Sequence, residues 1–155
     1  MILGLKKEVD MDAKELLLRL GAELDLKLNI SDEGVCRIYF DDDAVDFELT
    51  EDGLCLIAEL GIVPSEGNTE LLRTLLVGNL FGIATAGAVL SIDPNTDSIY
   101  LHKILYNGLS YATFEAQVES FVKALRHWKL QISQNSSSKE ETTKEQNIPD
   151  YSLRI

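Results

Sequence analysis

The sequence predicts an α+β fold in which a twisted antiparallel sheet packs with three helices, in the order αβββαββα. Apolar residues recur at helical spacing in three segments, and short β-rich runs bounded by turn residues lie between them. The chain has 155 residues, 45% of them hydrophobic, which suits one domain with its own core. We expect this domain to span residues 1–132. We expect residues 133–155 to form a disordered tail, because residues 134–147 include no apolar side chain.

The first helix is expected over residues 12–20, with Asp10 or Asp12 capping its start. Its inward face is apolar and consists of Ala13, Leu16, Leu17 and Leu20. Gly21 is its expected stop. Leu18 lies away from the inward face, so this helix carries more leucine than one core contact requires.

Three strands are expected next, over residues 35–40, 45–49 and 54–60. The middle run alternates strictly, which places its apolar residues inward and its acids outward. The aspartates 41–43 form a turn by composition, and Asp52–Gly53 is a signal for a tight hairpin. Together these features predict an antiparallel meander.

The second helix is expected to start at Asn68 or Thr69 and to run to about Leu80. Its apolar residues cover well over half of the helical wheel: Leu71, Leu72, Leu75, Leu76, Val77 and Leu80, followed by Phe81. A helix of this kind is buried on two sides. One three-stranded sheet covers a single side, so the other side needs a second layer or a second subunit.

The last part begins with a small-residue connection over residues 82–87. Two further strands follow over residues 88–92 and 98–105, with a turn at 93–97 between them. The final helix is expected from Ser110 to about Leu130. Its apolar stripe consists of Phe114, Val118, Phe121, Val122, Leu125 and Trp128.

Charge excludes several kinds of partner. The chain has 14 Lys and Arg against 26 Asp and Glu, a net charge of −12. This charge argues against nucleic acid and against anionic membrane surfaces, which both require basic residues. We find no signal peptide and no apolar run long enough to span a membrane. Cys36 and Cys55 are expected to be free thiols.

Catalytic, cofactor-binding and metal-binding patterns are also missing. Gly82 and Gly87 have the glycine spacing of a phosphate-binding loop, but Ala88 and Val89 stand where Lys and Ser or Thr are needed. The acidic turn at 93–97 lacks the later ligands of a calcium loop. His102 and His127 have no neighbouring ligand residue in the sequence. We therefore predict no catalytic residue, no cofactor and no metal, and a protein that is not an enzyme.

One segment resembles a known family. Residues 75–94 read LLVGNLFGIATAGAVLSIDP. This resembles the central signature of class I type III secretion chaperones of the Tir-chaperone (CesT/SycE) type, roughly L-L-x-A-N-L-F-G-x-x-T-G-G-x-x-L-x-x-D-P. Gly78 stands where Ala is common, and Ala86 replaces the first Gly of the usual pair. The final helix also resembles the last helix of that family.

The resemblance implies a homodimer through the second helix in the bacterial cytoplasm. Such a chaperone binds the N-terminal segment of a secreted effector without nucleotide hydrolysis and keeps it soluble and secretion-competent. The secretion apparatus is a further implied partner. The expected effector-binding residues are Leu16, Leu18, Leu20, Phe47, Ile99 and Leu101. The expected dimer residues are Leu72, Leu75, Leu76, Val77, Leu80 and Phe81. The alternatives are another peptide-binding α+β module outside secretion and a small acidic enzyme.

Overall fold

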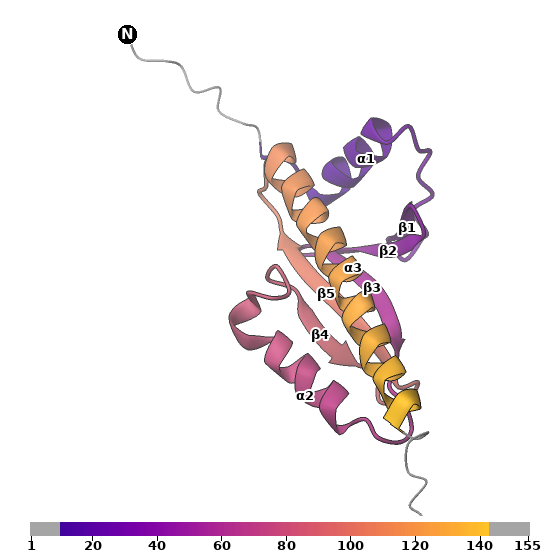
Figure 1. The fold of residues 1–155 in the computed structure, drawn as a ribbon. Helices are drawn as coiled ribbons and strands as arrows, with labels where there is room; N and C mark the ends of the chain where they lie inside the picture. Colours follow the sequence, from indigo (N-terminus) through magenta and orange to yellow (C-terminus); the bar gives the residue numbers. More distant parts are fainter. Residues whose placement is uncertain (1–9, 143–155) are drawn as a thin grey trace, which may run out of the picture.

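The computed structural model describes residues 10–142, with side chains as far as Asn135. Its elements follow the predicted order. They are α1 (Ala13–Glu23), β1 (Val35–Phe40), β2 (Asp43–Thr50), β3 (Gly53–Ile62), α2 (Thr69–Gly78), the 3₁₀ turn η1 (Leu80–Gly82), β4 (Val89–Ile92), β5 (Ser98–Tyr106) and α3 (Tyr111–Thr142). The α+β fold class is confirmed (Figure 1).

All five strands form one antiparallel sheet in the order β1-β2-β3-β5-β4. The first three strands form the predicted meander. β5 then pairs with β3 along most of its length, from Gly53↔Tyr106 to Ile62↔Ser98. This pairing displaces β4 to the outside, so the two edges of the sheet are β1 and β4.

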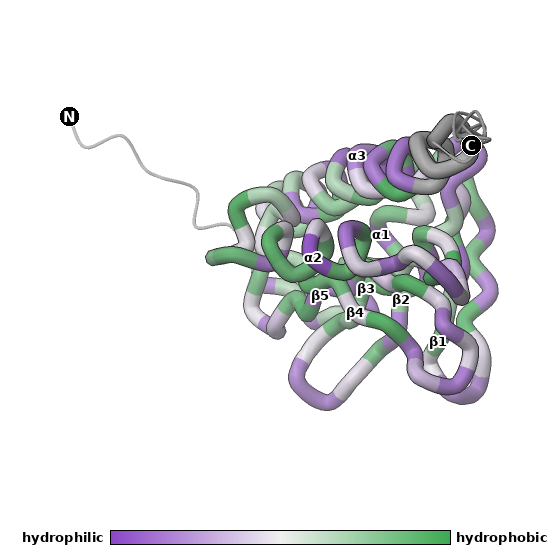
Figure 2. The backbone as a smooth tube through the Cα atoms, turned by 60° about the horizontal axis from the view of Figure 1, so that its bottom comes forward, coloured by the Kyte–Doolittle hydropathy of each residue, from purple (hydrophilic) through white to green (hydrophobic). Residues whose placement is uncertain are grey.

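The three helices lie on one side of the sheet, with α3 along its middle and α1 and α2 on either side (Figures 1 and 2). The predicted stripe of α3 faces the sheet, and all of its members are buried: Phe114, Val118, Phe121, Val122, Leu125 and Trp128. The strands contribute their inward residues to the same core, with Ile38, Val45, Phe47, Leu56 and Leu101 fully enclosed. No helix of the described residues covers the opposite face of the sheet.

The ends of α1 and α3 differ from the expected ones. Asp12 caps α1 as expected, and its side chain accepts a hydrogen bond from the Glu15 amide at 2.8 Å. The helix continues past Gly21 to Glu23. Gly21 is a packing site, since a Cβ there would stand 2.5 Å from Leu28 Cγ. The final helix continues past Leu130 to Thr142. Disorder of residues 133–155 stays a prediction, and residues 143–155 lie outside the described part.

Helix α2 ends at Gly78, two residues before the expected position, and the chain then turns through η1. Phe81 in this turn has a left-handed backbone, with φ of 54°. Within residues 10–142, no helix is long and apolar enough to cross a membrane.

Candidate protein-binding surfaces

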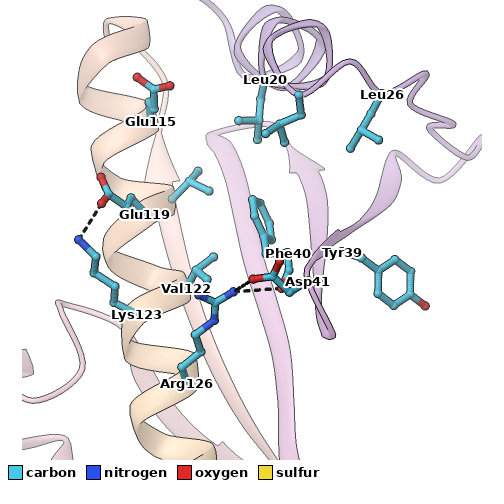
Figure 3. Close-up of a pocket in the computed structure, with 12 residues that line it drawn as sticks. Leu20, Leu26, Tyr39, Phe40, Asp41, Glu115, Glu119, Val122, Lys123 and Arg126 are labelled. Atoms are coloured by element: carbon cyan, nitrogen blue, oxygen red, sulfur yellow. Dashed lines mark hydrogen bonds and ion pairs between the residues drawn. The ribbon is translucent and has the colours of Figure 1, made fainter.

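An open groove of about 570 Å³ lies between α1, β1 and α3 (Figure 3). We call it the α1–α3 groove. Its apolar lining comes from Leu20, Leu24, Leu26, Tyr39, Phe40, Val118 and Val122, and its charged lining from Asp41, Glu115, Glu119, Lys123 and Arg126. Leu24 and Leu26 are substantially exposed, because α1 ends here and the chain leaves the core. The groove therefore presents accessible apolar side chains on a rigid frame.

Ion pairs hold one wall of the groove in place. Arg126 of α3 bonds to Asp41 at 2.7 Å and to Asp43 at 2.9 Å, and Lys129 bonds to Asp43 at 2.7 Å. The β1–β2 hairpin is thereby tied to α3. The charged groups of this wall therefore stand in ion pairs. Lys123 and Glu119, which also line the groove, form a further pair at 2.7 Å. Glu115 alone among the charged lining residues forms no ion pair with any described residue.

The ion pairs also set the acidity of Asp43. Partial burial alone would raise the pKa of this carboxyl. The hydrogen bonds and charges of Lys129 and Arg126 together outweigh burial, so the pKa lies below its usual value. The folded state therefore favours the ionised form of Asp43.

A second surface consists of the exposed apolar side chains of α2 and of the turn after it. We call it the α2 face, and its members are Leu76, Val77, Leu80, Phe81 and Ile83. Leu76 is 74% exposed, Ile83 82% and Phe81 86%. Such large side chains gathered in one place on a soluble domain mark an interaction surface. A shallow apolar pocket of about 300 Å³ adjoins this face between α2 and β4.

The small-residue connection behind the α2 face is fixed by three side chains. Trp128 Nε1 donates to the Ala84 carbonyl at 3.0 Å, and the buried Thr85 hydroxyl donates to the Ala88 carbonyl at 2.6 Å. Lys103 Nζ donates to the Ala86 carbonyl and to Gln117 Oε1. The ordered backbone keeps Phe81 and Ile83 pointing outward.

The two sheet edges differ in whether another strand can pair with them. On β4, the Asn79 amide accepts from the Leu90 N–H at 2.8 Å and donates to the Leu90 carbonyl at 3.0 Å. That side chain therefore occupies the outer backbone groups of β4 much as a neighbouring strand would. On β1, the Val35 carbonyl bonds outward to Ser31. By the alternation of an antiparallel ladder, the backbone groups of Arg37 and Tyr39 face the same edge, and no described residue pairs with them there.

The predicted effector-binding residues do not lie together on a surface. Five of the six are buried in the core: Leu16, Leu20, Phe47, Ile99 and Leu101. Only Leu18 is well exposed, at 48%. Periodicity along a strand or helix identifies its apolar face. The predicted binding residues lie mostly on those faces, which the sheet and the helices enclose in the core. Leu24, Leu26 and Tyr39 line the groove and were not among the predicted residues. Leu24 and Leu26 follow the expected first helix, and Tyr39 lies in the expected strand 35–40 but points away from the core.

The predicted dimer residues fall on two sides of α2, one facing the core and the other exposed, as expected for a helix that is apolar on both sides. Leu75 faces the core, Leu72 is half-buried, and the other four are exposed: Leu76, Val77, Leu80 and Phe81. The chain therefore covers one side of α2 by itself and leaves the other open.

The cysteines and histidines are not brought together. Cys36 shares the inner face of the sheet with Phe47, whereas Cys55 lies on the outer face, so the two thiols are apart. Burial raises the pKa of both thiols. Across residues 10–142, no group of three or more His, Cys, Asp or Glu side chains could hold a metal ion.

Comparisons with known proteins agree with this geometry. The sequence model of the Tir chaperone protein (CesT) family matches residues 15–129. No curated protein sequence gives a significant match.

Solved structures share the fold at low sequence identity. The HopA1–SchA chaperone–effector complex contains a chain with 22% identity and a TM-score of 0.62, covering 75% of this chain and 91% of that one. The ExsC–ExsE complex contains a chain with 22% sequence identity and a TM-score of 0.62. The match covers 77% of this chain and 95% of that one. The ExoU–SpcU complex from the type III secretion system of Pseudomonas aeruginosa contains a chain with 21% sequence identity and a TM-score of 0.62. The match covers 81% of this chain and 97% of that one.

Proposed function

Because this chain belongs to the Tir chaperone protein (CesT) family, we propose that it binds the N-terminal segment of a secreted effector and keeps that segment soluble and competent for type III secretion. The protein works by binding alone, without nucleotide hydrolysis or other catalysis, in the bacterial cytoplasm. Chains of the same fold occur in complexes described as chaperone–effector assemblies.

The α1–α3 groove is the observation that carries this proposal. It joins exposed apolar side chains to charges that are mostly paired with one another. An extended segment can bury apolar residues there without separating these ion pairs, and Glu115 is the one charged lining residue that has no partner among the described residues. Binding of this kind is reversible and spread over many contacts, as handover to an export apparatus requires.

The free edge of β1 gives the segment a second mode of contact. An open pocket of about 410 Å³ adjoins this edge and is lined in part by Leu26, Leu28 and Tyr39. Leu26 and Tyr39 also line the α1–α3 groove. A strand added along Arg37 and Tyr39 would bond to the free backbone groups and place alternate side chains toward the groove. The Asn79 contacts to Leu90 disfavour the same pairing at β4.

The α2 face completes the proposal as the interface of a homodimer. Its open apolar side chains lie on α2 and η1, whereas the α1–α3 groove lies on the other side of α3. Two copies joined through this face would each keep a groove free. The effector segment is then the partner at the grooves, and the second copy is the partner at α2.

Co-expression with N-terminal fragments of secreted proteins from the same bacterium tests this function. We expect one fragment to co-purify in fixed proportion and to lack stable structure of its own. Leu24→Asp should abolish co-purification, because Leu24 lines the groove and is 41% exposed. Leu130→Asp is the matched control, since Leu130 is 55% exposed and outside the groove. Equal retention by both folded variants would place effector binding elsewhere.

A catalytic role makes a different prediction. A small acidic enzyme would carry a bound ligand of fixed composition through purification. Native mass spectrometry of the purified protein distinguishes the two, since the chaperone proposal expects the mass of the homodimer with no further bound ligand in the absence of an effector.

A further inference from the structure

Phe81, in the turn that follows α2, combines a strained backbone with an exposed ring. Its φ of 54° lies in the left-handed region, which a bulky side chain rarely adopts. The side chain is 86% exposed, so contacts within the described chain do little to offset the cost of this conformation. Backbone strain of this kind persists where the surrounding structure holds it in place, and it is common at binding sites.

Hydrogen bonds on both sides of Phe81 fix its conformation. The Gly82 amide donates to the Asn79 carbonyl at 3.2 Å, and the Gly87 amide donates to the Gly82 carbonyl at 2.8 Å. The Asn79 side chain is in turn bonded to the backbone of Leu90 on β4. The ring of Phe81 therefore projects from an ordered turn, and little backbone freedom is left to lose when the ring is covered.

The pocket between α2 and β4, which we call the α2–β4 pocket, has room for an aromatic ring. Its volume is about 300 Å³, and an apolar cavity of about 150 Å³ is large enough to bind benzene. Asn79 lines this pocket and also accepts the hydrogen bond that closes the turn of Phe81. The ring and the pocket therefore belong to one continuous surface. Most of the lining is apolar and comes from Leu72, Leu75, Leu76, Leu90 and Ile92.

The surface around the ring and the pocket is almost free of charge. Residues 71–92 contain a single charged side chain, Arg73, in a chain with a net charge of −12. Two copies of so acidic a chain repel each other unless they meet through a surface without acids. A basic segment would gain nothing from charge at this surface, whereas the acidic parts of the chain attract it. A second copy of the chain is therefore the occupant that this surface fits.

We propose that Phe81 of each copy inserts into the α2–β4 pocket of the other copy in the homodimer. A two-fold interface brings the same patch of both chains together, so a projecting ring and a pocket on one patch meet twice. The inference rests on the homodimer of the proposed function and specifies the side chain that anchors it. The strained turn keeps the ring extended before the two copies meet.

Phe81→Ala tests the ring as an anchor. It should raise the dissociation constant of the dimer at least about a hundredfold, because burial of one ring contributes about a factor of ten or more and the dimer contains two. Sedimentation equilibrium of the full chain measures this constant without any effector, and circular dichroism checks that the variant is folded. Ile83→Ala is the matched control, since Ile83 is nearly as exposed on the same connection. An equal change in the two variants would overturn the proposal.

Mixing two variants tests the insertion itself. Phe81→Ala removes the ring, and Leu72→Trp fills the pocket. Only the mixed dimer has a ring that faces an open pocket. We expect about nine-tenths of the dimers to be mixed, against about half for random association, because one inserted ring favours the mixed dimer about tenfold over each homodimer. Native mass spectrometry counts the three species.

The mixing experiment has its own controls. Ile83→Ala combined with Leu72→Trp should give nearly random proportions, because both chains keep Phe81. Leu72→Phe adds a smaller ring at the same position and repeats the measurement if Leu72→Trp does not fold. Random proportions from Phe81→Ala and a folded pocket-filling variant would show that the ring does not enter the pocket.

These results are separable from the proposed function. If mixing is random while the natural chain is dimeric and retains an effector fragment, the inference is wrong and the function stands. If mixing is preferential but no effector fragment is retained, the inference stands and effector binding is wrong. If Phe81→Ala lowers effector retention and leaves the dimer constant unchanged, the ring contacts the effector, which contradicts the inference.

Discussion

The ring of Trp128 lies directly against the backbone of Gly78. A Cβ at Gly78 would stand 2.2 Å from Trp128 Cη2 and 3.0 Å from Leu90 Cδ1. This contact brings α2 and α3 together and also positions Trp128 to bond the Ala84 carbonyl. It accounts for glycine at a position where the resembling sequences commonly have alanine.

Gly78→Ala should therefore destabilise the protein. Alanine is favoured over glycine in a helix by about 1 kcal/mol, but overpacking a filled core costs about 1–3 kcal/mol. We expect a net loss of up to about 2 kcal/mol in the free energy of unfolding, measured by urea denaturation. In a Trp128→Phe background the same substitution should be neutral or stabilising, because the ring is smaller. Equal effects in both backgrounds would show that the two residues are not coupled.

Leu76→Asp should abolish dimerisation and leave a folded monomer. Leu76 is exposed on α2 in the single chain, so a charge there costs little until a second copy covers it. Light scattering should give the monomer mass for this variant and the dimer mass for the natural chain, with unchanged circular dichroism. Leu18→Asp serves as the control for an exposed leucine on another helix. A monomeric natural chain would contradict the dimer proposal.

Leu18→Asp also tests whether the outer side of α1 takes part in effector binding. We expect the affinity for the effector fragment to fall by about 1–3 kcal/mol, the scale of one lost apolar anchor. Calorimetry on folded protein measures this loss. An unchanged affinity, together with a loss in Leu24→Asp, would confine the binding site to the α1–α3 groove.

Asp43→Asn should change how stability depends on pH. The pKa of Asp43 is lowered in the folded state, so its ion pairs stabilise the fold fully above the pKa of the unfolded chain, about 4. That stabilisation is lost as the pH falls through the lower folded value. The variant should thus be less stable than the natural chain at pH 7, with the difference shrinking in acid. Asp42→Asn is the control, because Asp42 forms no ion pair among the described residues. A constant difference from pH 7 to pH 2.5, in urea midpoints, would contradict this account.

The sequence by itself determined the element order, the inward stripe of α3 and the two-sided character of α2. These features depend on local periodicity and turn chemistry, which a single segment contains in full. The recognisable run from Leu75 to Pro94 indicated the family for the same reason, since its motif is contiguous.

Only the tertiary structure decided which apolar side chains remain accessible. Alternation places Phe47 on the inward side of its strand, and the packed structure encloses both Phe47 and Leu101, which removes them from any binding surface. Leu24, Leu26 and Tyr39 form one groove because the end of α1, the following segment and the β1 edge meet beside α3. Such a surface depends on contacts between residues far apart in the sequence, and no local pattern contains that information.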